Sequence, residues 1–184
     1  MDVAASEKIC EIEKHLACAC SGLMADSRTM VDRARVEAQH HFFLYNEHMS
    51  TVGVTQAVSN LAIKFGDSDS GGAMSRPFGL AMLFAGIDPG TNLPSLYFMD
   101  PSGTYVECDA KAIGSGCEGA QSALKEQYSK SLNVQACTKE VIKILKQVME
   151  EKISSDNVEI AIITRDSGYR MLTKDEIQQV LSSI

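Results

Sequence analysis

The sequence lacks the features that would place it in a membrane, on the secretory route or on nucleic acid. No apolar run approaches the ~20 residues that a membrane helix needs. Residues 1–8 contain neither the basic segment nor the apolar segment of a signal peptide. Acidic residues outnumber basic ones, 24 to 17, and the net charge of −7 disfavours binding to nucleic acid. We therefore expect no membrane span and no nucleic-acid partner.

The spacings typical of disulfide frameworks and zinc sites are missing as well. The chain has six cysteines, but none stand in a C-x-x-C pattern, and most have apolar or small neighbours. In a chain of this length without a secretion signal, such cysteines are typically reduced and buried. This pattern predicts free thiols and a location in the cytoplasm and nucleus.

What the sequence does contain is typical of a globular protein. Apolar residues make up 45% and charged residues 22%, both ordinary values for a folded chain. With 184 residues, the chain is long enough to enclose a sizeable core. We expect residues 1–184 to form a single domain.

Residues 76–116 predict three consecutive strands around which the rest of the chain is organised. Turn sequences at residues 88–90 and 100–103 separate the strands. In the first strand, bulky and small apolar side chains alternate, so neither face is polar. We therefore expect other elements to cover both faces of this strand.

The flanking sequence predicts runs of strands separated by runs of helices. Two strands are expected at 8–20, helices at 26–46 and 51–65, helices at 115–128 and 134–152, a hairpin at 158–172 and a last helix from 173. Such runs favour an α+β fold with mainly antiparallel sheets, two sheets inside and helices outside. The residues expected to cap these helices are Asp26, Thr51, Ser115 with Glu118, and Thr173 with Glu176.

No catalytic constellation stands out from the sequence. The Gly-x-Gly-x-x-Gly pattern at 114–119 opens a helix, but a second helix follows where a dinucleotide fold needs a parallel strand. We therefore expect helix packing there, with no cofactor and no bound metal. A metal or redox site that combines Cys18 and Cys20 with a histidine is left as an alternative, although a C-x-C pair is a weak zinc signal.

Several segments together resemble the alpha-type subunits of the 20S proteasome. The matching segments are Lys8 with Ile9, residues 21–23, Asp26, and residues 32–35, 76–79, 100–103 and 112–116. Residues 55–62, 72–79 and 144–152 carry a narrower resemblance to a single alpha subtype. The resemblance covers the chain from about Lys8 onward, and its motifs are specific as a set.

The resemblance implies the N-terminal-nucleophile hydrolase fold, a four-layer αββα sandwich. It also implies a non-catalytic structural subunit of the outer alpha ring, supporting ubiquitin-dependent protein degradation and the docking of regulatory particles. Alpha-type subunits lack the N-terminal threonine nucleophile, and this chain contains no Gly-Thr-Thr processing site. An active hydrolase of this fold is the remaining alternative, and it would need an exposed Thr, Ser or Cys at its N-terminus.

The implied partners are neighbouring alpha subunits, beta-ring subunits and the C-terminal tails of regulatory particles. The lysine of the family's tail pocket matches Lys8, and the Gly-Leu pair after the next strand matches Gly22 and Leu23. A lysine at a strand start and a backbone turn at a glycine could bind a tail carboxylate and its main chain. Tail docking is therefore predicted at these three residues.

The resemblance further implies that the fold is N-terminally truncated. Alpha-type subunits have a gate segment, a helix and two strands before the position of Lys8, whereas Met1 lies seven residues ahead of it here. We expect an exposed sheet edge and self-association of the isolated chain.

Overall fold

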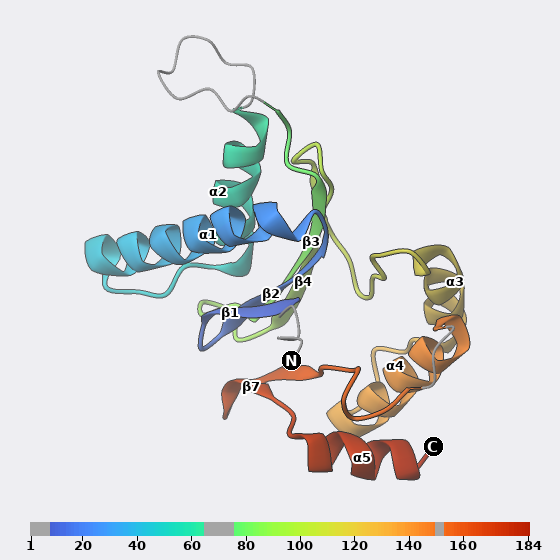
Figure 1. The fold of residues 1–184 in the computed structure, drawn as a ribbon. Helices are drawn as coiled ribbons and strands as arrows, with labels where there is room; N and C mark the ends of the chain where they lie inside the picture. Colours follow the sequence, from blue (N-terminus) through green and yellow to red (C-terminus); the bar gives the residue numbers. More distant parts are fainter. Residues whose placement is uncertain (1–7, 65–75, 150–152) are drawn as a thin grey trace. The chain divides into compact units, whose positions relative to one another are not determined.

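The computed structural model describes residues 8–64, 76–149 and 153–184, which fall into two compact units (Figure 1). The first unit comprises Met1–Cys108 and Ile163–Tyr169, and the second comprises Asp109–Ile162 and Arg170–Ile184. That residues 1–184 form a single domain stays a prediction. No helix of the described residues is long and apolar enough to cross a membrane.

The first unit is built on a five-stranded antiparallel sheet whose strands lie in chain order. Its strands are β1 (Ile9–Glu13), β2 (Leu16–Gly22), β3 (Leu80–Ile87), β4 (Pro94–Met99) and β5 (Tyr105–Glu107). The three strands expected within 76–116 are confirmed as β3, β4 and β5. The two expected at 8–20 are confirmed as β1 and β2.

The turns predicted between the central strands are also confirmed. The carboxylate of Asp88 accepts a hydrogen bond from the backbone N–H of Gly90, and Asp100 accepts one from Ser102. Such bonds let a short acidic side chain substitute for a backbone acceptor in a tight turn. The sequence at 66–72, whose glycine, serine and aspartate residues predict a polar loop, lies outside the described residues.

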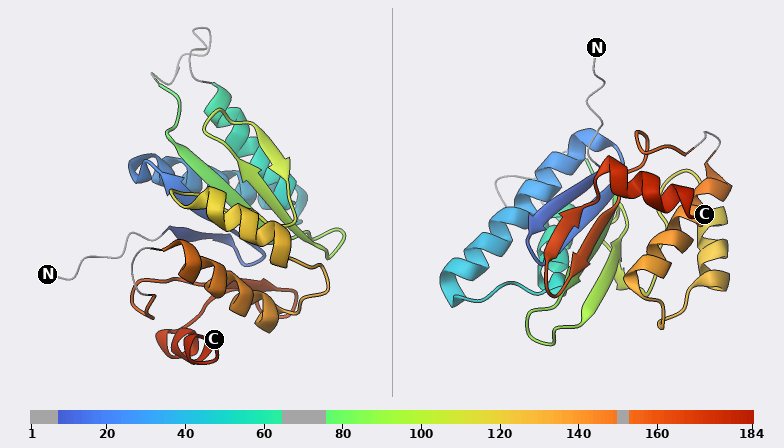
Figure 2. Two further views of the ribbon diagram at one scale, coloured as in Figure 1. Left: turned by 90° about the vertical axis from the view of Figure 1, so that its right-hand side faces the viewer. Right: turned by 90° about the horizontal axis from the view of Figure 1, so that it is seen from below.

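Two helices cover one face of this sheet, as Figure 1 and Figure 2 show. They are α1 (Met24–Tyr45) and α2 (Thr51–Ile63), which join β2 to β3. The bulky side chains of β3, including Met82 and Phe84, are fully buried against them. The opposite face of β3 is half-buried, so its alternation of bulky and small residues separates two different environments.

The second unit contains a helix pair and a final helix. These are α3 (Cys117–Gln127), α4 (Val134–Val148) and α5 (Lys174–Ser182). A Cβ on Gly119 would lie 3.3 Å from a methyl group of Val148, so the glycine lets α3 and α4 approach closely. The structure is therefore consistent with the packing interpretation of the glycine pattern at 114–119.

The expected hairpin forms a two-stranded sheet of β6 (Ala161–Thr164) and β7 (Gly168–Met171). Its first strand begins later than the sequence predicted, at Ala161. A turn at residues 165–167 joins the two strands, and Gly168, which follows the turn, adopts a φ of 66°. The two antiparallel sheets and the runs of helices confirm the α+β class.

Only one of the four predicted helix caps forms as expected. Thr173 and Glu176 make a reciprocal capping box at the start of α5. The box predicted for Ser115 and Glu118 is wrong, because α3 begins at Cys117 and has no side-chain cap.

The other two caps are displaced by neighbouring residues. Ser50, one residue before Thr51, caps α2 by accepting a hydrogen bond from the N–H of Gly53. Leu23 is the N-cap of α1, which places Asp26 inside the first turn. Asp26 is therefore free to bind partners far away in the sequence.

Candidate functional site

The three residues predicted to dock activator tails lie at one end of the five-stranded sheet. Lys8 directly precedes β1, and its carbonyl accepts a hydrogen bond of 2.8 Å from the N–H of Cys20 on β2. Gly22 ends β2, two residues beyond Cys20, and Leu23 follows it. Because β1 and β2 are antiparallel, the start of one strand meets the end of the other.

Gly22 holds a backbone conformation that few other residues could adopt. Its φ is 128°, and a Cβ there would collide with the carbonyl oxygen of Gly79 and approach Cα of Leu80 to 2.8 Å. The N–H of Leu23 donates a hydrogen bond of 2.8 Å to the same carbonyl of Gly79. The Gly22–Leu23 backbone is thus fixed against the chain that leads into β3, while the Leu23 side chain is 47% exposed.

Asp26 organises the chain behind this surface. Its two carboxylate oxygens each accept a hydrogen bond of 2.8 Å from the guanidinium of Arg76, and one also accepts from the N–H of Gly79 at 3.0 Å. The bonds from Arg76, followed by that from Gly79, hold the pKa of the Asp26 carboxyl below its usual value.

The surface therefore combines groups suited to an extended peptide end. Lys8 offers an exposed ammonium group, Leu23 an exposed apolar side chain, and Gly22 an exposed stretch of backbone. A C-terminal carboxylate and its adjoining main chain are the ligand that such groups complement.

Within the described residues, the cysteines of β1 and β2 do not belong to the group of side chains that could hold a metal ion. Cys10 lies opposite Cys18 in the strand pairing, and Cys18 and Cys20 are buried free thiols. Hydrogen bonding with the thiols of Cys10 and Cys20, together with burial, raises the pKa of the Cys18 thiol. These contacts favour packed, protonated thiols.

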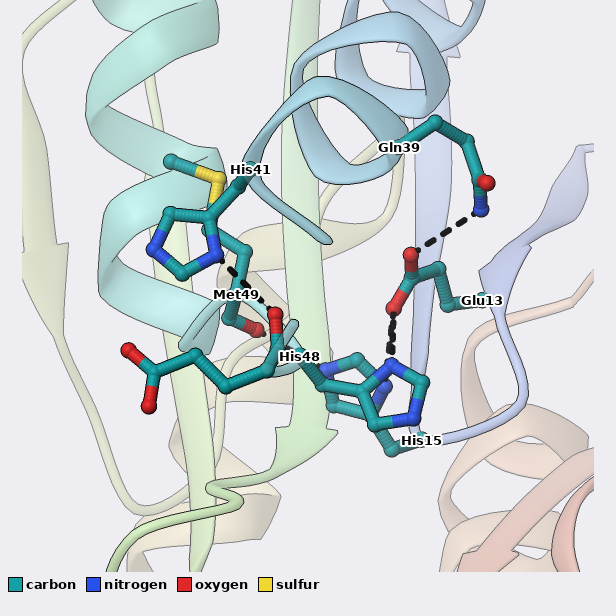
Figure 3. A network of polar contacts seen from close by, with 7 residues as sticks. Glu13, His15, Gln39, His41, His48 and Met49 are labelled. Carbon is teal, nitrogen blue, oxygen red and sulfur yellow. Dashed lines mark hydrogen bonds and ion pairs between the residues drawn. The ribbon is translucent and has the colours of Figure 1, made fainter. Parts of the chain in front are cut away.

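A different cluster, which the sequence did not reveal, gathers Glu13, His15 and His48 (Figure 3). Among the described residues, these three side chains are the group whose ligand atoms lie close enough to hold one metal ion. The group contains no cysteine. The signal was hidden because His48 lies 35 residues from Glu13 in the sequence. Only the return of the chain after α1 brings its ring to the end of β1.

Comparisons with known proteins agree with the resemblance found in the sequence. A family model described as "Proteasome subunit" matches residues 2–163. Proteasome subunit alpha type-5 of Drosophila melanogaster is 53% identical over 97% of this chain and 73% of its own length. The alpha type-5 subunit of Dictyostelium discoideum is 47% identical over 100% of this chain and 77% of its own length. The alpha type-5 subunit of Caenorhabditis elegans is 46% identical over 98% of this chain and 75% of its own length.

The narrower resemblance carried by residues 55–62, 72–79 and 144–152 is to alpha type-5, and these relatives confirm it. Their names indicate a non-catalytic subunit of the alpha ring in the 20S core particle. Neither alternative, an active hydrolase or a Cys/His metal or redox protein, gains support from the comparisons. On the extent of these matches, the chain belongs to the proteasome subunit family.

Proposed function

We propose that this chain acts as a non-catalytic structural subunit of the outer alpha ring of the 20S proteasome core. It assembles with other proteasome subunits, with alpha subunits as ring neighbours and beta subunits in the adjacent ring. In that place it supports ubiquitin-dependent protein degradation in the cytoplasm and nucleus. Similarity to alpha type-5 subunits along almost the whole chain supports this role.

Within this role, Lys8, Gly22 and Leu23 bind the C-terminal tails of regulatory particles. The observation that carries this assignment is the antiparallel pairing that brings Lys8 to the same sheet end as Gly22 and Leu23. The Lys8 ammonium pairs with the tail carboxylate, and the exposed backbone at Gly22 binds the tail's main chain. Leu23 provides apolar contact beside them.

Tail docking can be tested with the assembled particle that carries Lys8→Ala. We expect about tenfold weaker binding of an activator-tail peptide, because an exposed charge-assisted contact is lost. Lys125→Ala is the matched control, since it removes one exposed lysine from α3 in the second unit. Fluorescence anisotropy of a labelled peptide measures the affinity.

A peptide with an amidated C-terminus sharpens the test. Amidation should weaken peptide binding to the unmodified particle. It should cause little further loss of affinity in the Lys8→Ala particle, because both changes break the same contact. Unchanged affinity in Lys8→Ala would refute the docking assignment. Co-purification separates this result from the structural role, because alpha and beta subunits should still accompany the variant.

A further inference from the structure

Three side chains from two segments of the first unit, the end of β1 with its turn and the loop after α1, point their ligand atoms at one another. Glu13 ends β1, His15 lies in the following turn, and His48 lies in the loop between α1 and α2. Oε2 of Glu13 is 3.2 Å from Nδ1 of His15 and 3.0 Å from Nδ1 of His48. All three ligand atoms lie within 4.8 Å of one another. The two rings and the carboxylate therefore surround one small volume (Figure 3).

The hydrogen bonding of His15 leaves a lone pair directed into this volume. Its Nε2 lies 2.9 Å from the carbonyl oxygen of Met49, which can only accept, so Nε2 carries the hydrogen. In the neutral ring, Nδ1 then has a lone pair, and within the described residues this buried atom has no hydrogen-bond partner. Beside a carboxylate oxygen at 3.2 Å, this nitrogen needs either a proton or a metal cation between the two atoms.

The outer contacts resemble those that orient metal ligands. Ligating histidines usually donate their second ring N–H to a carbonyl or carboxylate, as His15 does to Met49. Ligating carboxylates are themselves hydrogen-bonded, and Gln39 donates to Oε1 of Glu13 at 3.1 Å. The Glu13 side chain is only 5% exposed, so its position is fixed by packing.

The spacing of the donors fits a tetrahedral zinc ion. Zinc binds imidazole nitrogen and carboxylate oxygen at about 2.0–2.2 Å, which makes the edge of the tetrahedron about 3.3–3.6 Å. The two distances that meet at Oε2, 3.0 and 3.2 Å, are somewhat shorter than this edge, so the donors would move slightly apart to admit the ion. Two imidazoles and one carboxylate also form a common ligand set for zinc with an open position.

We propose that Glu13, His15 and His48 bind a Zn²⁺ ion, with the fourth position open to solvent. The His48 side chain is 55% exposed, and both histidines line a hollow of about 390 Å³. Charged residues that line the same hollow are Lys14, Arg165 and Asp166. A water molecule can therefore reach the ion and complete its coordination. This site is separate from the tail-docking surface and does not depend on the proposed function.

Zinc titration of the full 184-residue chain, stripped of metal, tests the proposal. Isothermal titration calorimetry should show one Zn²⁺ bound per chain. Substitution of Co²⁺ should give the intense visible absorption of a tetrahedral site. His48→Ala should weaken zinc binding at least about 100-fold, because a direct ligand contributes more than an outer contact. Circular dichroism should show that this variant, changed at a largely exposed side chain, stays folded.

Two further variants separate specific coordination from general histidine affinity. His40→Ala removes an exposed histidine of α1 outside the cluster, and it should bind zinc like the unmodified chain. Gln39→Ala should weaken binding about tenfold by releasing the Glu13 carboxylate. The absence of zinc binding below about 100 µM would overturn the proposal, since a proton alone would then occupy the gap. Equal losses in His40→Ala and His48→Ala would overturn it as well.

Discussion

Replacing Gly22 with alanine tests whether the proposed docking surface depends on a backbone that only glycine can form. Gly22 has a φ of 128°, which L residues rarely adopt. The added Cβ would meet two backbone groups of the neighbouring chain, the Gly79 carbonyl and Cα of Leu80. Backbone atoms in a paired strand cannot rotate away as a flexible side chain can. The strands β2 and β3 would therefore have to separate at this end.

The expected loss of stability can be estimated from two costs, the unfavourable φ and the collision of the added Cβ with the neighbouring backbone. An unfavourable backbone conformation costs about 1–3 kcal/mol, and the forced shift of a strand adds to it. A total of about 2–4 kcal/mol lies in the range of strongly destabilising substitutions. For a chain of this size, each kcal/mol lowers the Tm by about 2–4 °C. We therefore expect Gly22→Ala to lower the Tm by about 5–15 °C.

Thermal unfolding followed by circular dichroism measures this change. Gly90→Ala is the matched control, because the nearest atom to its Cβ would be a carboxylate oxygen of Asp88 at an ordinary 3.4 Å. Its Tm should change by less than about 2 °C. A Gly22→Ala chain that unfolds within 1–2 °C of the unmodified one would refute the steric reasoning, and with it the glycine requirement of the docking surface.

Two other predictions concern titratable groups of the first unit. The lowered pKa of Asp26 stabilises the fold above the unfolded-state value of about 3.9, and this contribution is lost as the pH falls through the folded-state value. The stability advantage of the unmodified chain over Asp26→Asn should thus shrink between about pH 5 and pH 2 in urea titrations, and a constant difference would contradict it. The raised pKa and burial of Cys18 should make its alkylation at pH 8 at least about tenfold slower than that of the half-buried Cys137, as measured by mass spectrometry of the folded chain. Equal rates would count against a protonated, enclosed Cys18 thiol.

Most of the strands, turns and helices could be predicted from the sequence because the groups that form them are close together along the chain. Asp88 and Asp100 form the turns that their sequences indicated, since each carboxylate bonds to backbone two residues away. The alternation along β3 predicted a buried bulky face, and Met82 and Phe84 lie on it. The Thr173 capping box formed for the same reason, with both partners inside a single turn.

One of the cap errors arose because distant groups competed for a side chain. Asp26 has the chemistry of a helix cap, but Arg76 and Gly79 bind its carboxylate instead. No local pattern could reveal that competition, because Arg76 lies 50 residues away in the sequence. The residues proposed to dock tails were chosen only through a family resemblance, and the strand pairing shows that they share one end of the sheet.

The zinc cluster was missed for a related physical reason. Zinc motifs are recognised by short spacings on one helix or in one loop, and Glu13 and His15 supply only two ligands in that way. The third ligand, His48, belongs to a separate loop and approaches only after α1 has packed on the sheet. Sequence spacing alone cannot report that approach.

The contact between Asp26 and Arg76 also bears on when the chain can meet a partner. It closes a loop of 50 residues that contains all of α2 and most of α1. The Leu23–Gly79 hydrogen bond joins the same two segments. A chain that ends before Gly79 would therefore present Lys8 without the fixed backbone beside it. The proposed docking surface is thus a product of distant parts of the chain and not of one local motif.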